Sequence, residues 1–527
     1  MKDSLKISQK LSPRKYALFT GTLLLTSTGL ITRVLGFFYR IFLSRTIGAE
    51  GLGLYNMVHP VFGICFALCA GSIQTAISQS VAANVRKGRS IFRTGLVISV
   101  STSFILAWLI IRFQDFLAGS ILMEPRCAPL LTYIAVSVPC AAIHACINGY
   151  YYGMQRTRVP AFAQVIEQSV RIGAVFLIAD IMLEAGIEIT VQLAVAGHLI
   201  GEIASTLYTV AACQFFPPKL PDGTYAKDTD SDGRRFSAAA DSFRRTAPAL
   251  MTLALPLMGN RLILNMLSSA EAIWIPGSLN RFGLSSSEAF SIYGVLTGMA
   301  LPFILFPSTI FNSLAVLLLP TVAEAQSEGN ERRIAGTISM SLRYCLYVGI
   351  LCIGIFTLFG NDLGVSVFKD ENAGSVSMTL AWLCPFLYLV TTMGSILNGL
   401  GKTSTTFIQN VTALFVRLAF VLFGIPKFGI MAYLIGMLAS ELLLALMHIF
   451  SLKKQVAFSW NAWDMIVKPA LLMVMAIGIY YAAGSVCDPF AALPLFIRTG
   501  FHILILSLCY LLLLAGAHFF KGEIQAD

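Results

Sequence analysis

The chain has 527 residues, of which 56% are hydrophobic and only 12% are charged. This composition excludes an ordinary soluble domain and predicts an integral membrane protein. The formal net charge of +10 is expected largely on the cytoplasmic face, where it meets anionic lipid headgroups, so it does not indicate a nucleic-acid partner.

Long apolar runs recur along nearly the whole chain and predict about fourteen membrane-spanning helices, because about 20 helical residues cross a hydrocarbon core of roughly 30 Å. The expected fold is therefore an all-α polytopic membrane protein. No cleavable signal peptide is expected, since the first apolar stretch is too long and carries arginine. The predicted spans are 17–43, 53–83, 91–113, 128–153, 160–183, 190–215, 247–272, 288–321, 335–360, 376–400, 405–425, 428–452, 465–484 and 496–519.

Lysine and arginine collect in alternate loops, and this predicts the orientation because basic residues in short loops resist translocation. One side of the membrane receives the N-terminus, Arg86 to Arg89, the segment 219–245 and Lys521. The loops assigned to the other side hold few basic residues. Both termini are therefore predicted to be cytoplasmic.

The segment 216–246, "FPPKLPDGTYAKDTDSDGRRFSAAADSFRRT", is the only long polar connection in the sequence. It divides the chain near its middle and is read as a cytoplasmic linker. The predicted organisation is an N-lobe of helices 1–6 (1–215), this linker, a C-lobe of helices 7–12 (247–454), and helices 13 and 14 with a cytoplasmic tail (455–527).

The two lobes carry similar sequence strings. In the first, "GMQRTRVPAFAQVIEQSVRIG" precedes "GHLIGEIAS"; in the second, "GLGKTSTTFIQNVTALFVRLAF" precedes "AYLIGMLAS". Arg156 to Arg171 thus matches Lys402 to Arg417, and upstream Arg33 matches Arg261. These matches predict two parallel six-helix repeats around a central cavity.

The strings "TRVLGFFYRIFLSRTIGAEGLGLYNMV" and "IYGVLTGMALPFILFPSTIFNSLAVLLLPTVAEA" resemble the stage V sporulation protein B group of polysaccharide-biosynthesis membrane proteins. That group belongs with the MurJ-type lipid II flippases in the multidrug/oligosaccharidyl-lipid/polysaccharide superfamily. The resemblance covers essentially the entire chain. It implies alternating access, a bacterial cytoplasmic membrane location, and an undecaprenyl-pyrophosphate-linked sugar precursor as substrate. MurJ-type flippases carry a further basic residue in the segment matching Ile292–Pro302, and this sequence has none there.

The first predicted helix has a polar stripe and an apolar back, as expected for a helix that lines a hydrated cavity. A guanidinium at the bilayer centre costs roughly 2.5 to 3.5 kcal/mol, so its presence there indicates function. Arg33 and Arg40 are accordingly predicted to bind substrate, although Arg40 lies near the end of its span and could instead snorkel to the interface. The stripe consists of Thr22, Thr26, Gly29, Arg33, Gly36, Arg40 and Ser44.

The seventh helix repeats this device with Arg261 and Asn265, which are also predicted to bind substrate. Glu271 lies a little further round that helix, and a structural pair between Arg261 and Glu271 stays open as an alternative. Arg171 and Arg417, in the fifth and eleventh helices, are candidates for either substrate contact or packing. Glu167 could pair with Arg171 one turn away.

Four glutamates, Glu167, Glu202, Glu271 and Glu441, are candidates for ion coupling or charge pairing. His59, His144 and His198 are interpreted as packing residues, because a lone histidine on an apolar helix usually has that role. The eleven cysteines are scattered without metal-ligand spacing, so neither a metal site nor a disulfide is predicted. "GKTS" at Gly401–Ser404 lacks the first glycine of a phosphate-binding loop. No cofactor and no enzymatic activity are expected.

Three functions remain in competition. The leading hypothesis is a flippase for a lipid-linked anionic sugar, with membrane lipids and cell-wall synthesis proteins as further partners, because the arginine fork suits pyrophosphate. A multidrug cation antiporter of the same superfamily would instead expose carboxylates. A membrane scaffold that recruits wall-synthesis enzymes through segment 216–246 is the third.

Overall fold

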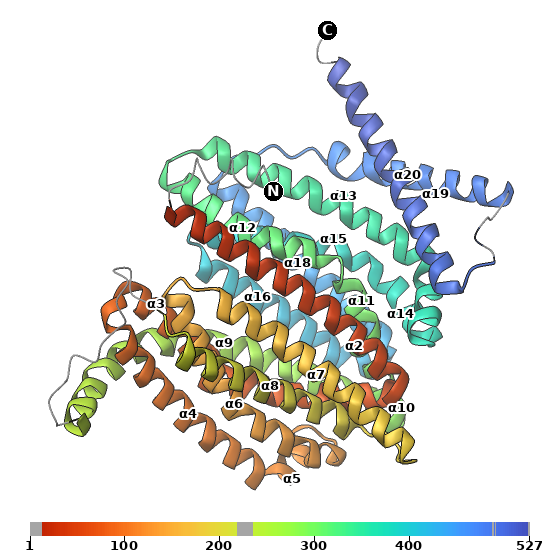
Figure 1. Ribbon diagram of the computed structural model, residues 1–527. Coiled ribbons are helices and arrows are strands. Elements are labelled where there is room, and N and C mark those ends of the chain that lie inside the picture. Colours follow the sequence, from red (N-terminus) through yellow and green to blue (C-terminus); the bar gives the residue numbers. More distant parts are fainter. Residues whose placement is uncertain (1–12, 219–234, 487–489, 491, 525–527) are drawn as a thin grey trace. The chain divides into compact units, whose positions relative to one another are not determined.

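The computed structural model describes residues 13–218, 235–486, 490 and 492–524, and these residues form helices and short turns without strands (Figure 1). Six short segments are π-helical and three are 3₁₀-helical: η1 (Ala67–Gly71), η3 (Leu117–Ile121), η5 (Val295–Ala300), η6 (Gly364–Phe368), η8 (Phe420–Gly424) and η9 (Trp463–Val467), then η2 (Val85–Lys87), η4 (Pro125–Cys127) and η7 (Ala381–Leu383). The α-helices are α2 (Pro13–Phe66), α3 (Ser72–Ala83), α4 (Gly88–Arg112), α5 (Gln114–Phe116), α6 (Ala128–Gly153), α7 (Arg158–Glu184), α8 (Val191–Phe215), α9 (Arg235–Phe282), α10 (Ser286–Gly294), α11 (Leu301–Leu305), α12 (Ser308–Ser327), α13 (Glu331–Leu363), α14 (Glu371–Leu380), α15 (Cys384–Gly399), α16 (Thr403–Ala419), α17 (Ile425–Phe428), α18 (Ile430–Gln455), α19 (Lys468–Val486) and α20 (Leu495–Ile524).

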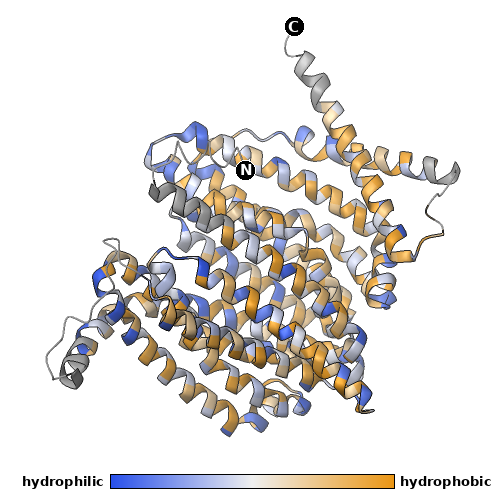
Figure 2. Cartoon of the chain, in the orientation of Figure 1, coloured by the Kyte–Doolittle hydropathy of each residue, from blue (hydrophilic) through white to orange (hydrophobic). Residues whose placement is uncertain are grey.

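Thirteen helical stretches of the described chain are long and apolar enough to cross a membrane. Figure 2 shows hydrophobic colour along the helices and hydrophilic colour concentrated near their ends. Large apolar side chains such as Trp108 and Leu512 point outward, 62% and 71% exposed, which suits a surface that faces lipid. The predicted class, an all-α polytopic membrane protein, is confirmed.

The predicted spans and linker differ from the observed helices in three places. The first two spans lie on one almost continuous stretch, Leu24–Ala83, and the single predicted span 288–321 is divided into Ser286–Leu305 and Ser308–Ser327. The break falls at Pro307, which lacks the N–H that a continuous helix would need. The predicted linker 216–246 is helical from Arg235 onward, and its residues 219–234 lie outside the described residues.

Contacts between residues divide the chain into two compact units. The first unit contains residues up to Tyr39 together with Leu54–Ile273, and the second contains Arg40–Gly53 together with Trp274–Asp527. This division falls inside α2 and α9, whereas the sequence repeats divide the chain in the polar segment. The predicted lobes follow the sequence repeat and stay a proposal. The two compact units follow the packing of the helices.

The helices of each unit pack in the same internal pattern. In the first unit, α6 is central and contacts α3, α4 and α8, while α7 packs on α8. In the second unit, α15 is central and contacts α12, α13 and α18, while α16 packs on α18. The chain order of the helices is also the same, so the structure supports the internal repeat that the sequence strings predict.

The turn after each central helix provides a more detailed match. Gln155 and Gly401 both adopt a left-handed backbone, with φ of 57° and 73°. The following residues donate equivalent backbone hydrogen bonds, from Arg156 N to Tyr151 O and from Lys402 N to Leu397 O, each 2.9 Å long. The turn that positions Arg171 is therefore built like the turn that positions Arg417.

One segment of α2 belongs to the second unit. Gly48 interrupts α2 with a non-helical φ of 69°. Beyond it, Gly53 and Gly294 lie so close that a Cβ on either would overlap the backbone of the other helix. Arg45 adds hydrogen bonds from Nε to Val367 O (2.9 Å) and from a terminal nitrogen to Ser366 O (3.1 Å), at the end of η6. Residues 40–53 are thus fastened to the second unit from several sides.

The two C-terminal helices α19 and α20 pack against each other and against α13. The Tyr510 hydroxyl donates to Tyr347 O (3.2 Å), and Lys468 Nζ donates to Ala517 O (2.9 Å). Met473 of α19 fills the space beside Gly354 of α13. These contacts place both helices in the second unit, outside the repeat.

Candidate functional site

Arg33 and Arg40 lie in different units although both belong to α2. Arg33 is exposed in the first unit. Arg40 belongs to the second unit and donates from its guanidinium to Thr297 O over 3.0 Å. Arg40 thus contacts backbone within the protein, an arrangement that the snorkelling alternative did not include.

The contact between Arg40 and Thr297 lies in a segment whose sequence departs from the pattern of the MurJ-type flippases. Thr297 belongs to η5, inside Ile292–Pro302, the stretch that lacks the basic residue expected from the resemblance. The structure brings a guanidinium to that stretch from α2 instead. A positive group is therefore present beside η5 even though the local sequence has none.

Arg261 and Asn265 face the α2–α3 region of the first unit. Arg261 donates to the Thr75 hydroxyl over 3.0 Å, and Asn265 Nδ2 donates to Gly63 O over 3.2 Å. Gly71 leaves the space that the Arg261 guanidinium occupies. Glu271 is buried, 6% exposed, and the described polar contact of Arg261 is with Thr75 rather than with Glu271.

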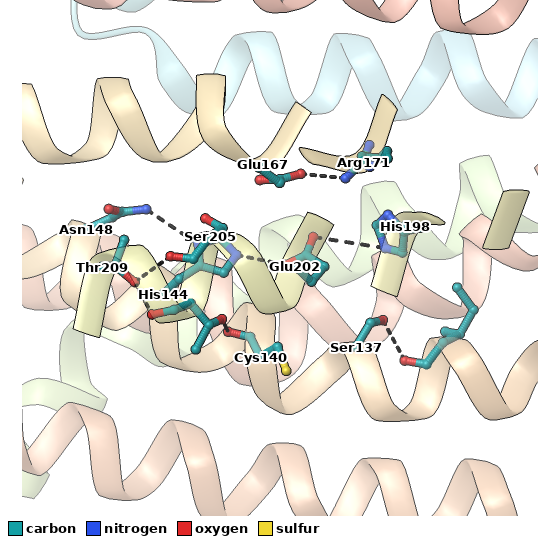
Figure 3. A network of polar contacts seen from close by, with 12 residues as sticks. Ser137, Cys140, His144, Asn148, Glu167, Arg171, His198, Glu202, Ser205 and Thr209 are labelled. Carbon is teal, nitrogen blue, oxygen red and sulfur yellow. Dashed lines mark hydrogen bonds and ion pairs between the residues drawn. The ribbon is translucent and has the colours of Figure 1, made fainter. Parts of the chain in front are cut away.

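A cluster of ionisable side chains lies inside the first unit, where α6, α7 and α8 meet (Figure 3). His144 Nε2 of α6 lies 2.9 Å from Glu202 Oε2 of α8. Glu167 and Arg171 of α7 form an ion pair of 2.5 Å one helical turn apart. A ring nitrogen of His144 and one carboxylate oxygen from each glutamate all lie within 4.8 Å of one another. The predicted Glu167–Arg171 pair is confirmed, and the cluster around it was not foreseen.

His198 extends this cluster along α8. It lies one turn before Glu202, with Nε2 and Oε1 4.0 Å apart, and its side chain is only 7% exposed. Neither ring nitrogen has a hydrogen-bond partner among the residues that the structure describes. Burial of a polar ring without such a partner costs free energy, so the interpretation of His198 as an ordinary packing residue does not describe its position.

The second unit has a simpler arrangement at the matching helices. Arg417 of α16 donates to Glu441 Oε1 of α18 over 2.8 Å and to the Ser440 hydroxyl over 3.2 Å. His448 of α18 bonds Gln409 of α16 over 2.7 Å. Each of these buried polar groups therefore has a partner across the same helix pair.

The sequence matches a known protein family over more than half of its length. The profile of a family described as polysaccharide biosynthesis protein matches residues 18–326, more than half of the chain. The chain belongs to this polysaccharide biosynthesis family. Stage V sporulation protein B of Bacillus subtilis (strain 168) is 28% identical to this chain over 467 residues. The match covers 87% of this chain and 88% of the relative.

Two solved structures share the fold of this polysaccharide biosynthesis protein. Lipid II flippase MurJ in its inward closed conformation matches 95% of the chain and 100% of its own length, with a TM-score of 0.70 at 15% identity. An inward-facing multidrug resistance MATE transporter of the MOP superfamily matches 83% of the chain and 99% of its own length, with a TM-score of 0.62 at 14% identity. The predicted resemblance to this superfamily is confirmed, and the chain shares the fold of these two membrane proteins.

Proposed function

We propose that this protein moves an undecaprenyl-pyrophosphate-linked sugar precursor, similar to lipid II, across the bacterial cytoplasmic membrane by alternating access. The observation that carries the proposal is the sign of the charge that is accessible within the spans. Arg33 is exposed on a helix apolar enough to cross the membrane. Glu202, Glu271 and Glu441 are buried, each at most 7% exposed. An accessible guanidinium suits a pyrophosphate, to which it can donate two hydrogen bonds.

Relatives in the comparisons support the same choice. One relative is a stage V sporulation protein, and a solved structure of the same fold is a lipid II flippase. The repeated packing of α3–α8 and α12–α18 supports alternating access, because many transporters move one structural repeat against another.

A multidrug cation antiporter is the second candidate, since a MATE transporter shares the fold. Such a protein should offer an accessible carboxylate to a cationic drug. Here Glu167 is paired with Arg171, and Glu441 with Arg417. The pairing of these acidic groups favours an anionic substrate over a cationic one.

Reconstitution of the purified protein in proteoliposomes tests the proposal directly. We expect binding and transbilayer movement of a defined undecaprenyl-pyrophosphate sugar, with no movement of cationic dyes. Export of cationic dyes, together with failure to bind any undecaprenyl-pyrophosphate species, would establish the antiporter instead.

Orientation and the scaffold alternative require a separate experiment. We propose that both termini and the 216–246 segment face the cytoplasm, so a cysteine introduced by Ser231→Cys should be labelled only from the inside. Labelling of that cysteine from outside would overturn the orientation. Deletion of 219–234 that leaves transport intact but abolishes assembly with wall-synthesis enzymes would favour the scaffold role.

A further inference from the structure

We propose that the first unit binds a single exchangeable proton on the array formed by His144, Glu202 and His198, and that this proton is the ion coupled to transport. The proposal goes beyond the flippase function, because it concerns the coupling ion and holds for any transported substrate. The three side chains lie near the middle of α6 and α8, where an ionisable group inside a membrane span is a functional site by default.

The charges of the cluster do not balance without a proton. Two carboxylates, Glu167 and Glu202, lie beside a single guanidinium, Arg171, and Arg171 forms its ion pair with Glu167. Glu202 is 5% exposed and has only the two imidazoles within ion-pair range among the described residues. An uncompensated buried charge costs free energy. One added proton neutralises the array and removes this cost.

The geometry shows where this proton can be held. His144 is already hydrogen-bonded to Oε2 of Glu202. His198 Nε2 faces the other oxygen, Oε1, at 4.0 Å, and both of its ring nitrogens are buried without a hydrogen-bond partner in the described part of the chain. Figure 3 shows the carboxylate placed between the two rings. A proton added at His198 Nε2 creates an N–H donor that a modest movement brings onto Oε1, and its release restores the neutral imidazole.

The helices packed against the array also contribute titratable groups. α7 contributes Glu167 and Arg171. α2 contributes Tyr39, Tyr55 and His59, and the His59 ring centroid lies 5.6 Å from that of His198. Phe62 of α2 packs edge-on against His198 at 4.8 Å. A change of charge at His198 therefore alters the electrostatic field at these side chains of α2. The same helix continues into the second unit.

The second unit supplies an internal comparison. Its matching helices pair one guanidinium, Arg417, with one carboxylate, Glu441, and its buried His448 is hydrogen-bonded to Gln409. That arrangement is balanced and has no buried imidazole that lacks a partner among the described residues. The proton site is thus confined to the first unit. A metal cation is disfavoured there, because the Arg171 guanidinium already occupies an oxygen of Glu167.

Potentiometric titration of the purified full-length protein in lipid nanodiscs tests the proposal without any sugar substrate. Near neutral pH, where an ordinary carboxyl takes up no proton, we expect wild-type protein to take up a single proton more than Glu202→Gln. The amide mimics the protonated carboxyl, so this variant should fold. The control Glu324→Gln, which removes an exposed carboxylate paired with Arg333, should take up as many protons as wild type near neutral pH, because an ordinary carboxyl titrates well below that range. His198→Gln should lose the same proton and serves as the second test if Glu202→Gln does not purify.

Two results would overturn the proposal. One is an identical titration of wild type, Glu202→Gln and His198→Gln. The other is tight binding of Zn²⁺ or Na⁺ by wild type that Glu202→Gln abolishes, which would make the cluster a metal site. Because these measurements use no transported lipid, they remain decisive even if the flippase assay fails. In proteoliposomes, transport driven by a pH gradient should be lost in His198→Gln, whereas binding of the lipid substrate should be retained.

Discussion

Gly153 and Gly399 occupy equivalent places at the ends of the two central helices. A Cβ built on Gly153 would lie 2.7 Å from the carbonyl oxygen of Ser78, and one on Gly399 would lie 2.8 Å from the carbonyl oxygen of Leu319. In each unit the second contact is with a valine of the same neighbouring helix, Val81 or Val322. Small residues at such positions let membrane helices approach closely, so both units use the same seam.

Substitution at this seam should therefore destabilise the protein. Gly153→Val forces α6 away from a backbone oxygen that cannot rotate aside, and we expect a cost of about 1–3 kcal/mol. Gly173→Ala is the control, because no atom lies within 4 Å of the Cβ built at this helical glycine, and alanine there should be neutral or slightly stabilising. Thermal midpoints of the purified variants provide the measurement. Equal midpoints for the two variants would show that the seam tolerates a side chain.

Arg33 should matter for transport more than for folding. An exposed guanidinium that donates charge-assisted hydrogen bonds to pyrophosphate contributes about 1.5–3 kcal/mol per bond, so Arg33→Ala should lower flux about 10- to 100-fold. Arg33→Lys should recover only part of this loss, because an ammonium keeps the charge but not the fork. Flux in proteoliposomes, normalised to the amount of folded protein, is the measurement.

Two outcomes would contradict this role for Arg33. Normal transport by Arg33→Ala would remove it from the substrate site. Failure of Arg33→Ala to fold, with recovery on adding Glu271→Gln, would make the arginine structural.

The ion pair between Arg417 and Glu441 should be a structural element of the second unit. Both side chains are largely buried, 16% and 9% exposed, so removing one partner strands the other and should cost about 3–5 kcal/mol. The double variant Arg417→Met with Glu441→Leu should recover most of that loss. Arg333 and Glu324, 42% and 47% exposed, form the control pair, for which about 0–1 kcal/mol is expected. A stable Arg417→Met variant with defective substrate binding would instead return Arg417 to the substrate site.

Helices α19 and α20 are predicted to hold the prenyl tail of the substrate. A shallow apolar pocket on α20 is lined by Cys509, Leu512, Leu513, Gly516 and Ala517. Leu512→Trp should fill this pocket and reduce flux of a long-chain substrate more than that of a short-chain analogue. Leu446→Trp, in a similar apolar pocket on α18, is the control and should not distinguish chain lengths. The same relative loss for both chain lengths in Leu512→Trp would refute the assignment.

Much of the fold was predictable because lipid imposes a simple rule on sequence. Each span must be apolar and must satisfy its own backbone, so hydropathy alone locates most helices. The errors occurred where backbone geometry decides the outcome. Pro307 ends a helix within the predicted span 288–321, and Gly48 permits a non-helical step inside α2. Both residue types were visible in the sequence as possible breaks.

The site was predictable only where its partners are local. Glu167 and Arg171 are four residues apart on one helix, and sequence spacing therefore predicted their contact. His144 and Glu202 meet across α6 and α8, and Arg417 meets Glu441 across α16 and α18. The register of one helix against another depends on packing along their whole length, which spacing does not encode. The spacing of His198 and Glu202 was the one available signal, since both lie on the same face of α8.

The exchange of chain segments between the two units has a consequence for fragment assembly. Cleavage in 219–234 would leave residues 40–53 on the N-terminal fragment, although Thr297 and Val367, which receive hydrogen bonds from Arg40 and Arg45, lie on the C-terminal one. It would equally leave Arg261 on the C-terminal fragment and its partner Thr75 on the other. Each fragment would carry residues that pack within the unit formed mainly by the other fragment. Neither fragment should therefore fold on its own. Co-expression of the two should restore a complex that copurifies without a covalent link.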